Sequence, residues 1–191
     1  MSTKFIFLTG KKFSGKSTVA NYIKTKYKNT VEVAFADPLK KICQELFLLD
    51  DNQLYNQDFK EKIDSRWNVS PRDLFQNIGD MFRNNLQKLL PNIKLEHGLV
   101  FTENIHYRVL QLLNSSTPPD VIIFSDGRLE DEHNYFKQNY KDGISIRIVR
   151  PNINNYDSHI SENGTFKTDI TIINDNTLTN LFKQIDTILY Q

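Results

Sequence analysis

With 191 residues, 39% of them hydrophobic, the chain can bury one well-formed core, so we expect a single domain over residues 1–191. Its 24 Lys and Arg against 23 Asp and Glu give a formal net charge of +1, which excludes the broad positive field of a nucleic-acid-binding protein and favours small molecules as partners. The lone Cys43 excludes an internal disulfide, and no apolar stretch has the length of a membrane span or the form of a signal peptide, so we expect a cytoplasmic protein away from membranes.

Strands and helices are expected to alternate along the chain. Apolar runs of six or seven residues, typical of strands covered on both faces, predict strands at 4–9, 31–36, 121–126, 144–150 and 169–175. Helical patterns lie between and after them, at 14–27, 37–48, 71–90, 98–114, 128–140 and 177–190. This order predicts an α/β fold, a three-layer sandwich with a mostly parallel central sheet and helices on both faces.

Two helices have clear start signals. Asp37 is expected to be an N-cap followed by Pro38 in the first turn, and Ser70 is expected to cap the helix that Pro71 begins. Between them, residues 50–68 are polar and predict a loop with helical turns around 59–67.

Two regions of the chain are expected to surround ligands. Residues of about 50–114 are expected to form a largely helical region, which the polar stripe and the resemblance described below make the acceptor-binding region. The stretch of about 150–167 has no hydrophobic period and many turn-forming residues, so it is expected to form a lid loop.

A glycine-rich segment joins the first predicted strand to the first predicted helix. Residues 10–18 read GKKFSGKST and match the P-loop pattern, in which glycines let backbone N–H groups turn toward phosphate oxygens. The start of the following helix directs its positive dipole end at the same point. In this pattern Lys16 bridges the β- and γ-phosphates of a nucleotide, and Ser17 is a ligand of Mg²⁺. A strand before the segment and a helix after it make a plain surface turn the weaker interpretation. Together with the alternating strands and helices, this motif predicts a fold of the P-loop NTPase type.

An acidic and a basic residue lie close together further along the chain. Asp126 ends an apolar run, as the Walker-B acid of a P-loop protein does, and would orient Mg²⁺. Arg128 follows two residues later. Ligands of open parallel sheets collect at the carboxyl ends of the strands, and that edge is predicted to carry the P-loop, Asp37, Asp126 and Arg150.

The helix after Ser70 carries a narrow polar stripe. At 100° per residue, Arg72, Gln76, Gly79 and Arg83 share one sector, while apolar side chains cover another. Two arginines suit a phosphate, a glutamine can pair with a base edge, and a glycine leaves room for a close approach. An ordinary solvated helix face with one helix-weakening glycine explains the stripe equally well.

Four other residues have open or ordinary interpretations. His159 and Glu162 stand three apart in a loop, which is far short of a metal site and fits either substrate contact or surface decoration. Cys43 lies among apolar residues, which favours core packing over reactivity. Trp67 either stacks on a base or anchors its loop.

In combination, several segments resemble the deoxynucleoside monophosphate kinases of tailed phages and giant DNA viruses. The resemblance runs nearly end to end, through KFIFLTGKKFSGKSTVANYI, AFADPLKK, RWNVSPRDLFQNIGDMFR, FSDGRLEDEHNYF, IRIVRP, DSHISENG and DITIINDNTLTNLF. It implies transfer of the γ-phosphate of ATP, with Mg²⁺ as cofactor, to a deoxynucleoside monophosphate. It also allows a homodimer, which no helix face establishes.

The residue patterns and the resemblance together predict the site. The predicted ATP-binding residues are Gly10, Lys12, Phe13, Ser14, Gly15, Lys16, Ser17, Thr18, Arg150 and Asn174. The predicted acceptor-binding residues are Leu39, Lys40, Arg66, Trp67, Arg72, Gln76, Gly79, Asp80 and Arg128. The predicted metal ligands are Ser17 and Asp126, and the predicted catalytic residues are Lys16, Arg128, Asp126 and Arg72.

The chain departs from the family pattern at three places. Ser17 stands where the family often has Asp, which keeps a hydroxyl for Mg²⁺. The segment between the second predicted strand and Trp67 is short, which weakens any assignment of contacts within it. Gly127 replaces a commoner Thr, and we expect it to add flexibility beside Arg128.

The expected mechanism is an in-line phosphoryl transfer in which positioning and charge neutralisation do the catalysis. No strong base is required, because the acceptor phosphate is already an anionic nucleophile. One rival is a kinase of another phosphorylated small molecule, similar to animal-type phosphomevalonate kinase. Another is a binding module that hydrolyses ATP slowly to switch partners.

Overall fold

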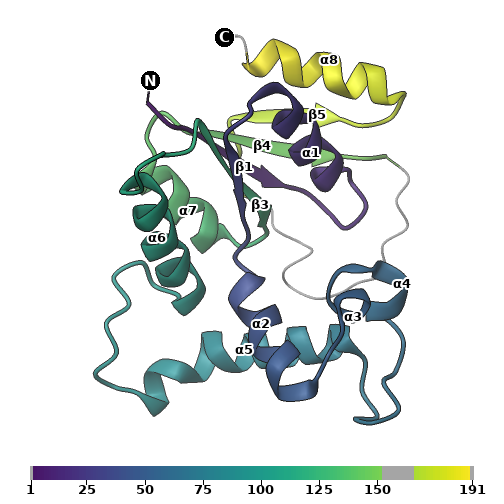
Figure 1. Ribbon diagram of the computed structural model, residues 1–191, viewed down its shortest axis with the longest axis vertical. Helices are drawn as coiled ribbons and strands as arrows, with labels where there is room; N and C mark the ends of the chain where they lie inside the picture. Colours follow the sequence, from purple (N-terminus) through teal and green to yellow (C-terminus); the bar gives the residue numbers. More distant parts are fainter. Residues whose placement is uncertain (1, 152–165, 190–191) are drawn as a thin grey trace. The chain divides into compact units, whose positions relative to one another are not determined.

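The computed structural model describes residues 2–151 and 166–189, and the chain divides into two compact units (Figure 1). Residues 1–35 and 105–191 make up an α/β unit, and residues 36–104 make up a helical unit. The expected lid loop, with His159 and Glu162, lies almost entirely outside the described residues.

The α/β unit is built on a parallel sheet. Its strands are β1 (Lys4–Thr9), β2 (Thr30–Val33), β3 (Val121–Gly127), β4 (Ile144–Val149) and β5 (Ile170–Ile173). They lie in the order β2-β3-β1-β4-β5, and each neighbouring pair is parallel. The helices wholly within this unit are α1 (Lys16–Lys26), α7 (Glu130–Asn139) and α8 (Leu178–Leu189).

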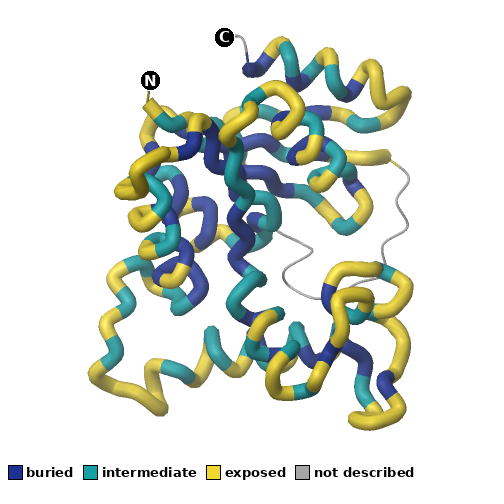
Figure 2. The backbone as a smooth tube through the Cα atoms, viewed as in Figure 1, coloured by how far each residue is buried: buried dark blue, intermediate teal, exposed yellow. Residues whose placement is uncertain are grey.

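Alternation along β1 distributes its side chains to two cores. Ile6 and Leu8 pack with α1 and α8 on one face of the sheet. Phe7 packs on the other face with α7 and with the part of α6 (Val100–Leu113) that begins at Ile105. Both faces are apolar because helices cover both, and the most continuously buried strands are the central ones, β1, β3 and β4 (Figure 2). The predicted three-layer α/β arrangement is confirmed.

The helical unit has its own small core. Its helices are α2 (Asp37–Phe47), α3 (Asp51–Tyr55), α4 (Gln57–Lys60), α5 (Pro71–Leu89) and the first residues of α6. The buried core residues are Leu39, Cys43, Leu49, Leu54, Leu74 and Phe101. Burial raises the pKa of the Cys43 thiol to about 11, so this cysteine is an apolar packing residue, as expected.

The structure confirms one predicted helix start and corrects the other. The Ser70 hydroxyl accepts the backbone N–H of Asp73 at 3.1 Å, so Ser70 is the N-cap of α5 and Pro71 its first residue. Asp37 is not an N-cap: Ala36 takes that position without a side-chain bond, and Asp37 is already helical. Instead, its Oδ1 lies 3.7 Å from Nζ of Lys40. In the first turn of α2 this negative charge is also stabilised by the positive end of the helix dipole.

The polar stretch after α2 is more regular than its composition indicates. Asp50 and Gln53 form a reciprocal capping box that starts α3, and the Asn56 side chain caps α4. The helical turns therefore lie at residues 51–60, earlier than the expected turns around 59–67. Short capped helices of four or five residues lack a hydrophobic period, which is why the pattern did not place them.

Candidate functional site

The loop between β1 and α1 has the backbone of a P-loop. Gly10 and Gly15 have φ angles of 143° and 109°, and Phe13 has a φ of 63°. A Cβ atom on Gly10 would lie 2.3 Å from the carbonyl oxygen of Ile148, and one on Gly15 would lie 2.7 Å from Nδ2 of Asn174. Both positions therefore require glycine for conformation and for space.

Lys16 lies over this loop. Its Nζ donates to the carbonyl oxygens of Gly10 at 2.6 Å and Lys11 at 2.9 Å. Burial, with a further contribution from the charge of Arg128, lowers the pKa of Lys16 to about 7, while Asp126 acts in the opposite direction. Three of the four predicted catalytic residues are therefore close enough to influence one another at the P-loop.

Binding of a triphosphate is expected to return a proton to Lys16. With a pKa of about 7, the ligand-free amine is roughly nine-tenths neutral at pH 8 and roughly one-tenth neutral at pH 6. Phosphate oxygens favour the charged amine and raise its pKa, so ATP binding should take up about 0.9 proton at pH 8 and about 0.1 at pH 6. Calorimetric titrations in buffers of different ionisation enthalpy measure this number.

The Lys16→Met variant is the control for the proton count. Any ATP that it binds should carry no such pH-dependent uptake. An equal uptake in the variant, or none in the wild type at pH 8, would show that Lys16 does not gain a proton when ATP binds.

Two features of the loop fit a phosphate group. The Ser14 side chain is buried, and its hydroxyl has no partner among the described residues. Gly15 is the N-cap of α1 and supplies no side-chain bond, which leaves the N–H groups of the first turn available for an anion. Ser17 is exposed in this first turn, and Asp126 lies near the end of β3. A hydroxyl and a carboxylate are groups of the kind that bind Mg²⁺.

In the described ranges, no three His, Cys, Asp or Glu side chains group closely enough to hold a metal ion by themselves. A metal at this loop would therefore depend on few protein ligands. Mg²⁺ commonly binds in that way, through one or two side chains together with phosphate oxygens and water.

The carboxyl ends of β2 and β3 meet at Asp126. Its Oδ1 accepts the backbone N–H of Phe35 at 2.7 Å, which fixes the carboxylate at the strand end. The adjacent Gly127 is buried, and a Cβ there would lie 2.1 Å from the Phe7 ring. Close packing, rather than the expected flexibility, therefore accounts for glycine at this position.

Glu132 supports the backbone at Arg128 and was missed in the sequence. Its Oε2 accepts the N–H groups of Arg128 at 2.8 Å and Leu129 at 3.0 Å. The carboxylate is 4% exposed and stands three residues after Leu129, the N-cap of α7. A glutamate three residues after a helix cap is the signal that could have indicated it.

Asn174 connects β5 to the P-loop. Its Nδ2 donates to the carbonyl oxygen of Ser14 at 2.8 Å, and its backbone N–H donates to that of Val149 at 2.7 Å. The predicted residue thus holds the loop backbone in place. Arg150 is exposed just after β4, and the Nζ of Lys12 lies 5.0 Å from the centre of the Phe13 ring.

The predicted acceptor residues other than Arg128 lie on the helical unit. On α5, Arg72, Gln76 and Gly79 are partly or fully buried, whereas Asp73 and Asn77 are exposed. The polar stripe is therefore not the solvated face of the helix.

The close approach expected at Gly79 comes from within the unit. A Cβ on Gly79 would lie 3.0 Å from Nη1 of Arg83 and 3.1 Å from the buried Leu39. Arg83 also pairs with Asp80 at 3.1 Å and lies over the Phe101 ring. The glycine accommodates the guanidinium of its own helix.

Arg66 and Trp67 both anchor their loop. Arg66 donates to Asp64 and to the carbonyl oxygen of Leu48, and this pairing holds the pKa of the Asp64 carboxyl well below its usual range. The Trp67 indole donates to the carbonyl oxygen of Phe47 at 2.8 Å. Trp67 is still 43% exposed, so its ring retains a face for another contact. Lys40 lies over the Tyr55 ring, 5.1 Å from its centre.

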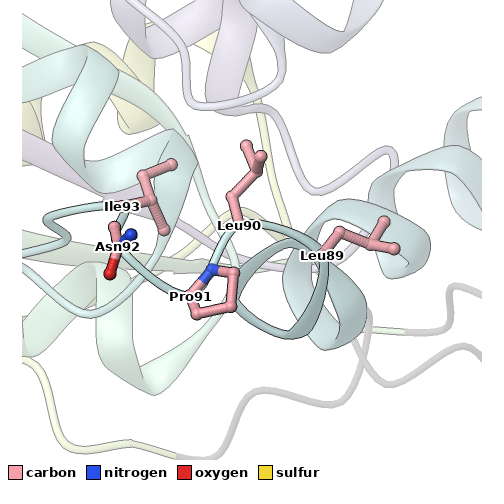
Figure 3. A pocket seen from close by; sticks show the side chains of 5 residues that line it. All are labelled: Leu89, Leu90, Pro91, Asn92 and Ile93. Carbon is pink, nitrogen blue, oxygen red and sulfur yellow. The ribbon is translucent and has the colours of Figure 1, made fainter.

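A shallow apolar depression follows α5. It is lined by Leu89, Leu90, Pro91, Asn92 and Ile93, whose side chains are shown in Figure 3. It contains no charged or nucleophilic side chain, so it offers no catalytic chemistry.

The parallel sheet, its strand order and the glycine-rich loop between β1 and α1 define an α/β protein of the P-loop fold. The crystal structure of TT1252 from Thermus thermophilus shares this fold, with a TM-score of 0.53, 14% identity and coverage of 100% of this chain and 98% of that one. The APS kinase CysC of Mycobacterium tuberculosis gives a TM-score of 0.48 at 11% identity over 99% of this chain and 98% of that one, a likeness too low to support an inference. No family model matches the chain.

A curated relative identifies the family. Over 188 residues the chain is 37% identical to a protein of Acanthamoeba polyphaga mimivirus described as a "putative deoxynucleotide monophosphate kinase", covering 94% of this chain and 93% of that protein. The chain belongs to the deoxynucleotide monophosphate kinase family, which confirms the resemblance seen in the sequence. None of the described helices is both long and apolar enough to cross a membrane.

Proposed function

We propose that this protein transfers the γ-phosphate of ATP to deoxynucleoside monophosphates and so produces diphosphates for DNA synthesis. The observation that carries the proposal is the placement of Lys16 over a P-loop backbone, near Asp126 and Arg128, in a chain that belongs to this family. The substrates are small molecules, and we place the reaction in the cytoplasm, that of the host if the chain is viral.

The P-loop residues hold the donor in this proposal. The N–H groups at the start of α1 and the Ser14 hydroxyl bind phosphate oxygens, and Lys16 stabilises the group in transfer. Asn174 keeps the loop in shape, and Lys12 and Arg150 contribute positive charge toward ATP in this proposal. Mg²⁺, when bound by Ser17 and Asp126, neutralises charge on the phosphates.

The arginines hold the acceptor in this proposal. Arg128 and Arg72 bind its phosphate through forked donors, and Gln76 binds its base. The other predicted acceptor residues shape the pocket: Leu39, Lys40, Arg66, Trp67, Gly79 and Asp80. Because the acceptor phosphate is itself anionic, orientation is sufficient and no protein base takes part.

A panel of acceptors tests the proposal. ADP formation should be measured by a coupled assay with each deoxynucleoside monophosphate, with phosphomevalonate and with no acceptor. We expect turnover with one or more deoxynucleoside monophosphates at least 100 times the rate without acceptor. Turnover with phosphomevalonate alone would identify a different kinase. An equal rate with and without acceptor would identify a hydrolytic switch.

A further inference from the structure

Two side chains near α4 hold the guanidinium of Arg72. The Nε of Arg72 donates to Oε1 of Glu61 at 2.9 Å, and its Nη2 donates to Oε1 of Gln57 at 3.0 Å. Gln57 is the first residue of α4, and Glu61 is the residue that caps its C-terminal end. Both partners therefore come from the polar segment 50–68, for which the sequence predicted a loop with helical turns around 59–67.

The two bonds leave one end of the guanidinium available. An arginine has five N–H donors in a planar fork, and these bonds use one on Nε and one on Nη2. Nη1 has no hydrogen-bond partner among the residues that the structure describes. The Arg72 side chain is 16% exposed, so its aliphatic part is packed and the fork cannot swing freely. The Arg72 guanidinium is therefore fixed in position while the N–H groups of Nη1 remain available to a ligand.

We propose that Gln57 and Glu61 are positioning residues that orient Arg72 for the acceptor phosphate. This inference rests on the proposed function, because it takes Arg72 to contact that phosphate. A long flexible side chain loses rotamer freedom when it binds a ligand, and two bonds made beforehand reduce that loss. Gln57 and Glu61 lie four residues apart, at the two ends of the capped helix α4.

The opposite effect is also testable, because Glu61 is an anion beside a proposed anion site. Its carboxylate could compete with the acceptor phosphate for Arg72. Glutamine at position 61 separates the two effects: it keeps an oxygen that can accept from Nε and removes the negative charge. Alanine removes both the oxygen and the charge.

The experiment compares Michaelis constants of Glu61→Ala, Glu61→Gln and Gln57→Ala with the wild type. KM should be measured for a deoxynucleoside monophosphate and for ATP, together with kcat. We expect Glu61→Ala to raise the acceptor KM about tenfold, the size of a lost charged hydrogen bond, with the ATP KM unchanged. Glu61→Gln should stay within about threefold of the wild type, and Gln57→Ala should raise the acceptor KM less than Glu61→Ala does.

Glu45→Ala is the matched control, since it removes an exposed carboxylate of α2 that has no partner among the described residues. A lower acceptor KM in both Glu61 variants would overturn the proposal in favour of competition. An acceptor KM in Glu61→Ala equal to that in Glu45→Ala would overturn it as well. If the wild type shows no acceptor-dependent turnover, the proposed function itself fails, and this inference fails with it.

Thermal melting separates positioning from folding. The Glu61 side chain is 49% exposed, and exposed ion pairs contribute little to stability, so each variant should melt close to the wild type. If Glu61→Ala melts far lower than the wild type, its KM no longer tests the proposal. The acceptor KM values of Glu61→Gln and Gln57→Ala then decide it. A tenfold rise in the acceptor KM of Glu61→Gln would then contradict the proposal.

Discussion

Replacing Lys16 by methionine is expected to lower phosphoryl transfer by about 10³-fold, because the variant loses the charge that stabilises the group in transfer. Methionine has a similar length and no charge, so it fills the same space over the loop. The rate of ADP formation at saturating acceptor, measured in the same coupled assay, gives the effect.

The same substitution should not weaken the ligand-free fold. Burial lowers the pKa of Lys16 from 10.5 to about 7, so the unfolded chain binds this proton more tightly than the folded chain does. The resulting penalty on folding is full below about pH 7 and disappears above about pH 10.5. At pH 7 the variant is therefore expected to melt no lower than the wild type.

Lys11→Met is the matched control for this prediction. It removes the same charge from the same loop, and the Lys11 side chain is exposed and has no partner among the described residues. We expect it to keep most of the activity. Equal losses in the two variants would mean that the net charge of the loop matters, and not the position of Lys16.

Replacing Gly127 by threonine should give the largest loss of stability among the changes considered. The new Cβ would lie 2.1 Å from the Phe7 ring, and Phe7, a residue of β1, is fully buried in the core that it shares with α7. Overpacking of this kind costs about 1–3 kcal/mol, and a branched residue should fall at the upper end. For a chain of this size we expect the melting temperature to fall by about 6–12 °C.

A second substitution tests the stated cause. Phe7→Leu shortens the side chain that the introduced threonine would meet, so the double variant should recover part of the melting temperature relative to the sum of the single losses. Strictly additive losses would contradict the steric explanation. The single Phe7→Leu variant supplies the reference for that comparison.

The sequence predicted what depends on local pattern. The alternation of apolar runs and helical stripes predicted the parallel sheet, and the P-loop pattern placed Lys16 at the start of α1. Ser70 was found because its hydroxyl, Pro71 and Asp73 form a local signal.

Contacts between distant segments were not predictable in this way. The contact between Gly127 and Phe7 joins residues 120 positions apart, and no pattern within either strand indicates it. The bonds from Arg72 to Gln57 and Glu61 depend on the short capped helix α4, whose composition resembles a loop. Asp37 was assigned to the wrong helix position because an Asp-Pro pair fits both the N-cap and the first turn.

The central claim is that a phosphate passes from ATP to a deoxynucleoside monophosphate, and tracing the γ-phosphate tests it most directly. ATP labelled at the γ-phosphate should be incubated with the protein, Mg²⁺ and each deoxynucleoside monophosphate, and the products separated by chromatography. We predict label in the deoxynucleoside diphosphate, lost in Lys16→Met and kept in Lys11→Met. Label found only in inorganic phosphate, at a rate independent of the acceptor, would contradict the claim.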